Sequence, residues 1–150
     1  MLNCLLIRPK QPPSINSFNR QKRTRLTSEL QTAFETFQDD AAAVLSGDLY
    51  GIIYYFHREV KKGNQVDADN ISKPVWDSLK NVIYTDDAQI KLRIAGTYDL
   101  TENYYENLNV KNLSQDIRKA FNEAFVKEAH ILYIECGKLE DKMYQFNLKS

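Results

Sequence analysis

Strand-like and helix-like segments alternate along this chain, and that alternation restricts the fold more than any other feature of the sequence. Continuous or alternating apolar runs are typical of strands, whereas apolar residues three and four positions apart are typical of amphipathic helices. A chain of 150 residues is also the size of one domain with a single core. We therefore expect a single α/β (α+β) domain over residues 1–150, in which a mixed β-sheet is packed with helices.

The expected elements follow from these patterns and from the turn residues between them. Strands are predicted at residues 2–9, 48–60, 88–100, 130–137 and 143–149, of which the last two close the fold. Helices are predicted at 27–45, at about 70–81 and at 113–128, and the connecting segments include a polar loop at 10–25, a turn at 61–65 and a loop at 101–109. The helix positions expected to be buried are Leu30, Ala33, Phe34, Phe37, Ala41, Val44, Ile71, Val75, Trp76, Leu79, Val82, Leu113, Ile117, Phe121, Ala124 and Phe125.

Several classes of protein do not fit this sequence. The longest apolar run, residues 50–56, is far shorter than the ~20 residues that a membrane-spanning helix needs. The N-terminal segment lacks the basic start of a secretion signal. Cys4 and Cys136 stand far apart, without the spacing of a zinc site or a disulfide framework. We therefore expect a cytoplasmic protein. We also expect His57 and His130 to have structural roles, because neither has a partner residue at the spacing of a metal or catalytic site.

The charges of the chain balance, with 20 basic and 20 acidic residues. Zero net charge counts against a nucleic-acid partner, because phosphate-binding proteins are usually basic. Four of the acidic residues form two close pairs, however, and cations bound there would leave 20 basic against 16 acidic residues, a balance of +4. Basic residues also cluster at 20–25 and at 57–62, where a DNA-contacting surface and an ordinary solvated surface are equally good interpretations.

The two acidic pairs flank the second predicted helix. Asp67 and Asp69 precede it, and Asp86 and Asp87 follow it. Carboxylates held close together disfavour each other's charge, so the pattern is typical either of a well-solvated loop surface or of a site that binds a cation. An extended backbone through the first pair would send both of its side chains to the same side.

A structural role competes for one of these acids, because Asp69 or Asn70 can cap the predicted helix. Capping explains one acid but not its neighbour. Lys73 lies four residues after Asp69 and four before Asp77, so the three side chains share one helix face. Pro74 removes a backbone donor near the start of this helix, whose first residue the sequence leaves open.

A turn after the helix would bring Asp86 and Asp87 back beside Asp67 and Asp69. Carboxylate oxygens are the ligands that Mg²⁺ and Mn²⁺ prefer, and Mg²⁺ held by two or three of them keeps positions open for water and a phosphate oxygen. Such an ion lowers the pKa of an attacking water and neutralises the charge that grows on a phosphate during its cleavage. This is the chemistry of a nuclease, in which Lys73 would stabilise the transition state or orient the nucleophile.

Other motif-based functions have no support in the sequence. An EF-hand loop beginning at Asp67 would need an acid or Asn, a Gly and a Glu where the chain has Ile71, Ser72 and Ser78. The Gly-rich loops that bind nucleotides are also missing from the sequence.

The arrangement of these residues resembles the central motif of the RusA family of Holliday-junction resolvases. An upstream segment, "PPSIN" at 12–16, resembles the N-terminal loop motif of that family. The resemblance covers residues 1 to about 99 and leaves 100–150 as an additional helix and closing strands, of which we expect the helix to pack on the sheet. The matching positions of the central motif are Asp67, Asp69, Asn70, Lys73, Asp77 and Leu79, followed by Asp86, Asp87 and Ile90.

This resemblance implies a homodimer that binds four-way junctions or other branched DNA and resolves them by paired nicks, using Mg²⁺ or Mn²⁺, in DNA recombination and repair. The family's catalytic residues fall on Asp67, Asp69, Lys73 and Asp87. Its metal ligands fall on the same three aspartates, with Asp86 as a further candidate. The candidate DNA-binding residues are Ser14, Asn16, Arg20, Lys22, Arg23, Arg25, Lys61 and Lys62.

Two alternatives remain open on the sequence. The first is a branched-DNA-binding protein that has lost catalysis, which the complete set of Asp67, Asp69, Lys73 and Asp87 counts against. The second is a domain whose acids only cap helices and solvate the surface, and a metal titration separates it from a nuclease.

Overall fold

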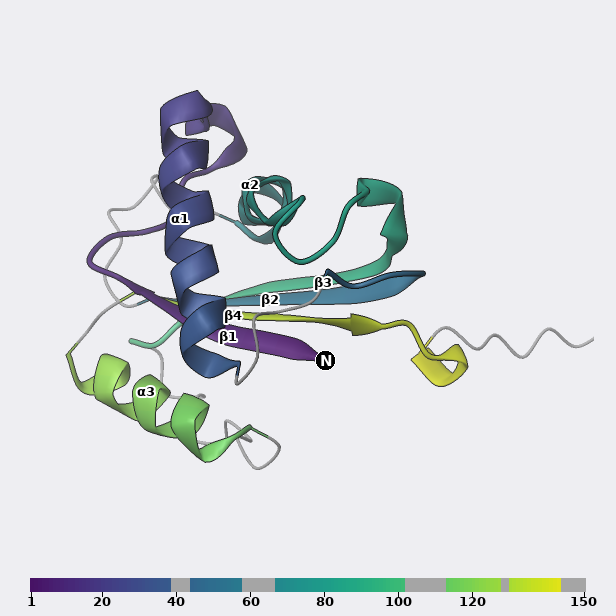
Figure 1. Cartoon of the computed structure of the whole chain (residues 1–150). Coiled ribbons are helices and arrows are strands. Elements are labelled where there is room, and N and C mark those ends of the chain that lie inside the picture. The colour runs from purple at the N-terminus through teal and green to yellow at the C-terminus, as the bar shows by residue number, and fades with distance from the viewer. Residues whose placement is uncertain (39–43, 58–66, 102–112, 128–129, 144–150) are drawn as a thin grey trace, which may run out of the picture.

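The described part of the chain forms three helices and a four-stranded mixed sheet (Figure 1), which confirms the predicted α/β (α+β) class. The computed structural model describes residues 1–38, 44–57, 67–101, 113–127 and 130–143. Two short 3₁₀ turns matter for the site, η1 (Ile15–Ser17) and η2 (Asp87–Gln89). In chain order the main elements are β1 (Leu2–Arg8), α1 (Arg20–Phe37), β2 (Leu49–His57), α2 (Ala68–Leu79), β3 (Ile90–Asp99), α3 (Gln115–Val126) and β4 (His130–Lys138).

The strands of the sheet are arranged in the order β1-β4-β2-β3. β2 and β3 are parallel, whereas β4 is antiparallel to both of its neighbours, β1 and β2. The parallel pair requires a crossover connection, and α2 supplies it. The predicted strand at 130–137 is confirmed, and as β4 it lies inside the sheet between β1 and β2.

The sheet is covered on both faces (Figure 1): α1 and α2 lie on one side, and α3 lies on the other. Because side chains alternate between the two faces along each strand, the core has one part on each side of the sheet. Ile53 and Tyr55 of β2 point toward α1 and α2, whereas Phe56 points toward α3. The core on the α1 and α2 side also includes Leu26, Leu30, Phe34, Ile71, Val75, Trp76, Leu79, Leu132 and Ile134.

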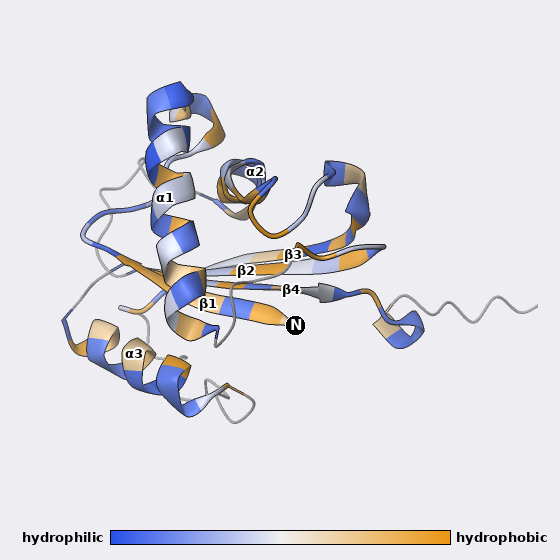
Figure 2. Ribbon diagram, viewed as in Figure 1, coloured by the Kyte–Doolittle hydropathy of each residue, from blue (hydrophilic) through white to orange (hydrophobic). Residues whose placement is uncertain are grey.

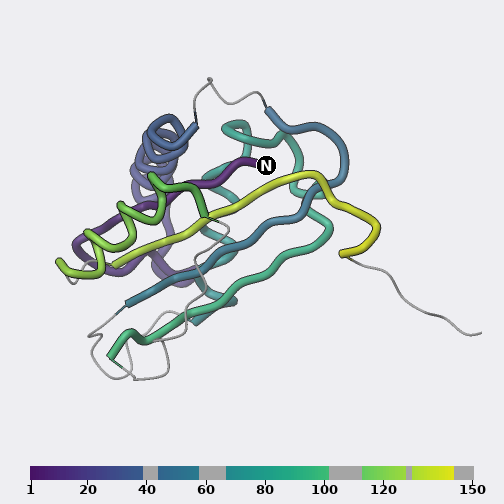
Figure 3. Tube along the Cα trace, turned by 90° about the horizontal axis from the view of Figure 1, so that it is seen from below, coloured from purple at the N-terminus to yellow at the C-terminus, as the bar shows by residue number. Residues whose placement is uncertain are grey.

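The helix α3 packs on the sheet, as its apolar face predicts. Viewed from below (Figure 3), it crosses β1 and β4, and it packs against both strands. Its buried residues Ile117, Phe121 and Ala124 join Leu5 and Ile131 of those strands in a second core. Residues beyond 100 therefore complete the sheet and cover one of its faces.

The first helix differs from its predicted bounds at both ends. Residues 20–25 were expected in a loop because they lack apolar periodicity, yet α1 begins at Arg20, where the side chain of Asn19 accepts a hydrogen bond from the backbone of Lys22 at 2.9 Å. Arg, Lys and Gln are good helix formers, and burial begins only at Leu26. The first turns are correspondingly hydrophilic in Figure 2.

The helix ends at Phe37, eight residues earlier than predicted, because Gln38 has extended backbone and closes the last turn with its N–H. Val44, expected on the buried face, is exposed. Position 41, the turn at 61–65 and nearly all of the predicted loop at 101–109 and strand at 143–149 lie outside the described residues.

Two negative expectations can be compared with the described residues. No helix among them is long and apolar enough to cross a membrane. Cys4 and Cys136 are buried free thiols rather than a disulfide. Burial raises the pKa of the Cys136 thiol to about 12, so it stays protonated and inert.

The position of α2 on the sheet depends on a close contact between Trp76 and Gly51. Trp76 is 1% exposed, and its indole ring covers the backbone of Gly51 in β2 so closely that an added Cβ would lie 2.4 Å from Cζ2 of the ring. No larger residue fits there without moving the ring. Glycine at position 51 therefore sets how near α2 approaches the sheet.

We predict that Gly51→Ala lowers the free energy of unfolding by about 1–3 kcal/mol, because the new methyl group overpacks a fully buried ring. Urea denaturation measures this change. The matched control is Gly96→Ala, whose Cβ would meet the hydroxyl end of Tyr98 at 2.7 Å, and Tyr98 is half-buried where Trp76 is fully buried. Equal losses in the two variants would contradict the role assigned to the Trp76 contact.

Candidate active site

The acidic residues at 67–69 belong to the start of α2 rather than to an extended segment. Asp67 is the N-cap, and its Oδ1 accepts a hydrogen bond from the backbone N–H of Asn70 at 2.9 Å. Asp69 lies in the first helical turn, where a negative charge is favourable near the positive end of the helix. Asp67 itself has extended backbone (φ −80°, ψ 172°), as predicted, but the extended conformation does not continue through Asp69, because the helix begins at Ala68. The expected capping by Asp69 or Asn70 is wrong, because Asp67 is the cap.

Lys73 forms the ion pair that its spacing predicts, but with only one of its two candidate partners. Its Nζ lies 3.2 Å from Oδ2 of Asp77, one turn further along α2. Lys73 is exposed, and a pair of this kind contributes little to stability. Asp69 lies one turn before Lys73 on the same side of the helix, beside the cleft described below.

Pro74 lies inside α2 and does not end it. The proline ring removes one backbone donor from the helix. The buried Ser78 hydroxyl donates to the carbonyl of Pro74 at 2.7 Å, which ties the following turn together. The helix therefore continues past the proline to Leu79 with Lys73 and Asp77 on a regular surface.

The C-terminal end of α2 is held by two hydrogen bonds from α1. The last four carbonyls of a helix lack partners within it. Here the carbonyl of Asp77 accepts from Nη2 of Arg23 at 3.1 Å, and that of Ser78 accepts from the Thr27 hydroxyl at 3.1 Å. Both donors come from α1, so the N-terminal half of α1 fixes the helix that carries Lys73.

The chain then turns back beneath α2. Asn81 adopts a left-handed conformation (φ 66°), which Asn tolerates better than most residues. Val82 and Ile83 donate their N–H groups to the carbonyl of Leu79, and the Tyr84 hydroxyl donates to the carbonyl of Trp76. The last turn of α2 and the segment that carries Asp86 and Asp87 therefore form one connected structure.

Asp86 and Gln89 organise the turn before β3. Oδ1 of Asp86 accepts from the N–H of Ala88 at 2.9 Å, which caps η2. Oε1 of Gln89 accepts from the N–H groups of Thr85 and Asp86, each at 2.9 Å, and its Nε2 donates to the carbonyl of Gly47 at 3.1 Å. The Asp86 carboxylate thus has a local structural role that Asp87 does not share.

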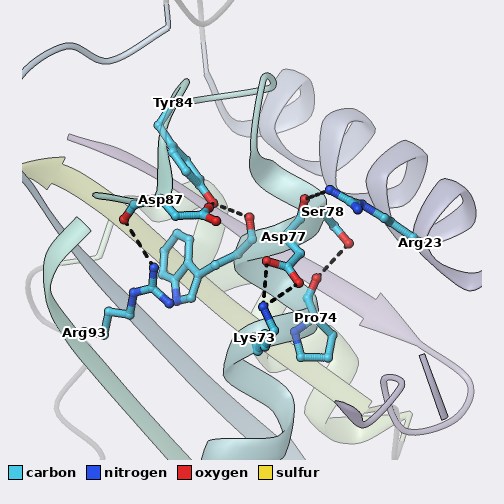
Figure 4. A network of polar contacts seen from close by, with 9 residues as sticks. Arg23, Lys73, Pro74, Asp77, Ser78, Tyr84, Asp87 and Arg93 are labelled. Atoms are coloured by element: carbon cyan, nitrogen blue, oxygen red, sulfur yellow. Dashed lines mark hydrogen bonds and ion pairs between the residues drawn. The ribbon is translucent and has the colours of Figure 1, made fainter. Parts of the chain in front are cut away.

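Asp87 lies between Tyr84 and Arg93 (Figure 4). The Tyr84 hydroxyl donates to Oδ1 of Asp87 at 3.1 Å, and Nη2 of Arg93 donates to the backbone carbonyl of Asp87 at 3.4 Å. Burial, and then the Asp87 carboxylate, raise the pKa of Tyr84, so its hydroxyl keeps its proton and remains a donor. Tyr84 therefore positions the side chain of Asp87, and Arg93 contacts its backbone.

A cleft of about 430 Å³ lies between the N-terminal half of α2 and β3. Asp69 and Lys73 line it from α2, and Arg93 lines it from β3. The remaining lining residues are small, namely Ala68, Ser72 and Ala95. Arg93 faces this cleft and also contacts Asp87, so it connects the two parts of the sequence that contain the acidic pairs.

The structure does not gather all the candidate acids at one point. Asp67 caps the N-terminus of α2, whereas Asp87 is linked through Tyr84 to Trp76, nine residues further on and about 13 Å along the helix axis. Within the described ranges, no three Asp, Glu, His or Cys side chains lie close enough to hold a metal ion. Asp69 is grouped with Lys73 and Arg93 instead.

The basic cluster at 20–25 lies on the first turns of α1, close to α2. Arg20, Lys22 and Arg25 are exposed, whereas Arg23 donates to α2 and has a structural contact. Ser14 and Asn16 lie at η1, which contacts α2. Lys61 and Lys62 lie outside the described residues.

The two histidines lie away from this cleft and belong to the interior. His57 is buried, with its ring 5.1 Å from that of Tyr55. His130 has a pKa lowered by burial, and its Nδ1 lies 2.6 Å from the Tyr55 hydroxyl. The ring packing of His57 and the Tyr55 contact of His130 agree with the structural role expected for both.

Sequence reasoning missed three residues of this site: Tyr84, Gln89 and Arg93. Gln89 left a local signal, because an acid followed three residues later by Gln is a capping-box pattern. Tyr84 and Arg93 left none, since their roles depend on the fold that brings them to Asp87. Their contacts could be found only from the structure.

Comparison with known proteins gives a family match to the part of the chain that contains the cleft. The family model for endodeoxyribonuclease RusA matches residues 16–105, more than half of the chain and every residue of the cleft. No curated protein gives a match to this chain. The chain therefore belongs to the RusA family, whose members are endodeoxyribonucleases that act on branched DNA junctions as Holliday-junction resolvases.

We predict that Arg23→Ala destabilises the protein by about 1 kcal/mol, because it removes the donor to a terminal carbonyl of α2. Urea denaturation gives the free energy of unfolding. Arg25→Ala is the matched control on the same helix and should change it by less than about 0.5 kcal/mol, as surface substitutions usually do. If Arg25→Ala is as costly as Arg23→Ala, the link between α1 and α2 is not what stabilises this region.

Proposed function

We propose that this protein is a Mg²⁺-dependent, structure-specific endonuclease that resolves four-way or other branched DNA junctions by paired nicks. Mn²⁺ is the expected substitute for Mg²⁺. The supporting observation is the cleft between α2 and β3, where Asp69, Lys73 and Arg93 meet and where Arg93 also contacts Asp87. The proposed catalytic residues are Asp67, Asp69, Lys73 and Asp87.

The chemistry of the donors fits a hard divalent cation. Asp67, Asp69 and Asp87 are all exposed carboxylates, and the hydrogen bonds described for Asp67 and Asp87 each involve Oδ1 alone. The other oxygen of each is available to a ligand, and carboxylate oxygens are those that Mg²⁺ prefers. Asp86 is a weaker candidate because it caps η2. When bound, Mg²⁺ would supply Lewis acidity toward water and the phosphate.

The side chains of the chain itself have separable roles in this scheme. Tyr84 and Arg93 orient Asp87, since one contacts its carboxylate and the other its backbone. Lys73 carries a positive charge beside the cleft, where it would stabilise the negative charge that develops on the cleaved phosphate. Its ion pair with Asp77 holds the ammonium group near the cleft without burying it.

The exposed basic residues at the start of α1 are suited to the DNA flanking the cut. Arg20, Lys22 and Arg25 lie on the helix that Arg23 fastens to α2, and they would contact phosphates without reading sequence. Ser14 and Asn16 lie at η1 beside α2, and we include them in the same surface. Lys61 and Lys62 are proposed to extend it on sequence grounds alone.

We infer that the active form is a homodimer. Resolution of a four-way junction requires two matched nicks, and a two-fold symmetric enzyme matches the symmetry of the substrate. The associated role is in recombination and repair of DNA in the cytoplasm, where such junctions form.

The test is cleavage of a synthetic four-way junction, with a linear duplex of the same sequence as control. We expect nicks in the junction with Mg²⁺ or Mn²⁺, little cleavage with Ca²⁺, whose coordination is looser, and none with EDTA. The duplex should stay intact under all conditions. Cleavage that proceeds equally in EDTA would exclude the metal-dependent mechanism, and a protein that binds the junction but never cuts it would be a binding protein only.

A further inference from the structure

Arg93 presents its charge to the cleft from the opposite side to Lys73. It lies on β3, an edge strand of the sheet, and its side chain is exposed on the face that α2 covers. Its position is set by register, because Gly51 and Arg93 are partners on β2 and β3 and Gly51 lies beneath the ring of Trp76. The contact between Trp76 and Gly51 that positions α2 therefore also sets the position of Arg93 relative to this helix.

The two cations of the cleft differ in what already engages them. Lys73 is paired with Asp77 at 3.2 Å. The described contact of Arg93 is one long hydrogen bond, 3.4 Å from Nη2 to the Asp87 carbonyl. A guanidinium group has five donors in a planar fork that matches two phosphate oxygens, so this contact leaves most of its donors for a ligand.

The walls around Arg93 allow a DNA backbone to approach. Ala68 and Ala95 have small side chains, and Ser72 adds a hydroxyl group beside Lys73. Asp69 is the acidic residue of the cleft, so a phosphate bound to Arg93 would also lie near one of the proposed metal ligands. Because Arg93 also contacts the Asp87 carbonyl, the bound phosphate would lie near Asp87, a second proposed metal ligand.

From this geometry we propose that Arg93 binds the phosphate that is cleaved, as the second cationic group of the active site alongside Lys73. This inference rests on the proposed nuclease function and deepens it. Arg93 would hold two oxygens of the phosphodiester and neutralise the charge that grows on them during cleavage. Because Arg93 also contacts the Asp87 carbonyl, it would hold the phosphate at a defined position relative to Asp87.

The experiment compares Arg93→Gln, Arg93→Lys and Lys91→Gln with the parent protein. Lys91 lies two residues away on the same exposed strand and does not line the cleft, so it is the matched control for charge. Single-turnover cleavage of a four-way junction in Mg²⁺ gives the rate, and junction binding in EDTA over a range of salt concentrations gives affinity and its salt slope. Circular dichroism and the fluorescence of Trp76, the single tryptophan of the chain, verify folding.

We expect Arg93→Gln to lower the cleavage rate about 100-fold or more, in line with loss of one transition-state donor, and to reduce the salt slope by about one phosphate contact. Affinity should fall much less than the rate. Arg93→Lys should keep the salt slope and recover part of the rate, because it keeps the charge but not the fork. Lys91→Gln should cleave as the parent does.

The outcomes separate this inference from the proposed function. A parent protein that does not cut junctions in Mg²⁺ overturns the proposed function itself. If the parent cuts and Arg93→Gln cuts at the same rate, the function stands and the role of Arg93 is excluded. A slower rate with an unchanged salt slope also excludes phosphate binding, because it shows that Arg93 acts only through Asp87.

Discussion

The site depends on how α2 is fixed to the sheet. Trp76 packs directly on the backbone of Gly51, and the end of the helix is held by Arg23, Thr27 and Tyr84, which donate to its terminal carbonyls. Buried packing supplies most of the stabilisation of a helix in a protein, and the carbonyl contacts define its orientation. Because α2 is held at both its face and its end, the exposed side chains of its first turns have a defined position relative to β3.

This arrangement divides the active site between a helix and the edge of a sheet. The parallel crossover from β2 through α2 to β3 brings Asp69 and Lys73 opposite Arg93, although Arg93 lies 24 and 20 positions after them in the chain. The return segment after α2 then presents Asp87 to Tyr84 and Arg93. Residues outside the family match contribute indirectly, because β4 lies between β1 and β2 and α3 covers the opposite face.

Local patterns in the sequence were sufficient to predict most of the helices and strands and to select the candidate acids. The periodicity of Ile71, Val75 and Leu79 predicts α2 and its buried face, and the spacing of Lys73 and Asp77 predicts their pair. The start of α1 was missed because its first turns project beyond the core and carry no apolar stripe. The central place of β4 and the contacts of Arg93 depend on long-range pairing, which no local pattern encodes. Asp69 was placed in extended backbone together with Asp67, because two acids separated by one residue fit a strand and a helix start equally well.

The central proposal is that the carboxylates of the site, Asp67 at the start of α2 and Asp87 after its end, bind divalent cations rather than serve as surface charges. Thermal unfolding of the parent, Asp67→Asn and Asp87→Asn with EDTA and with Mg²⁺ tests it most directly. Asn keeps both hydrogen bonds, since it caps helices well and still accepts from Tyr84. Asp116→Asn on α3 is the charge-matched control.

The account predicts that Mg²⁺ at about ten times its Kd raises the melting temperature of the parent and the control by roughly 3–6 °C. In EDTA the two site variants should melt at or above the temperature of the parent, because repulsion within each acidic pair is relieved, and their Mg²⁺ shifts should be smaller than that of the parent. A parent protein without a Mg²⁺ shift, or site variants that keep the full shift, would contradict the account.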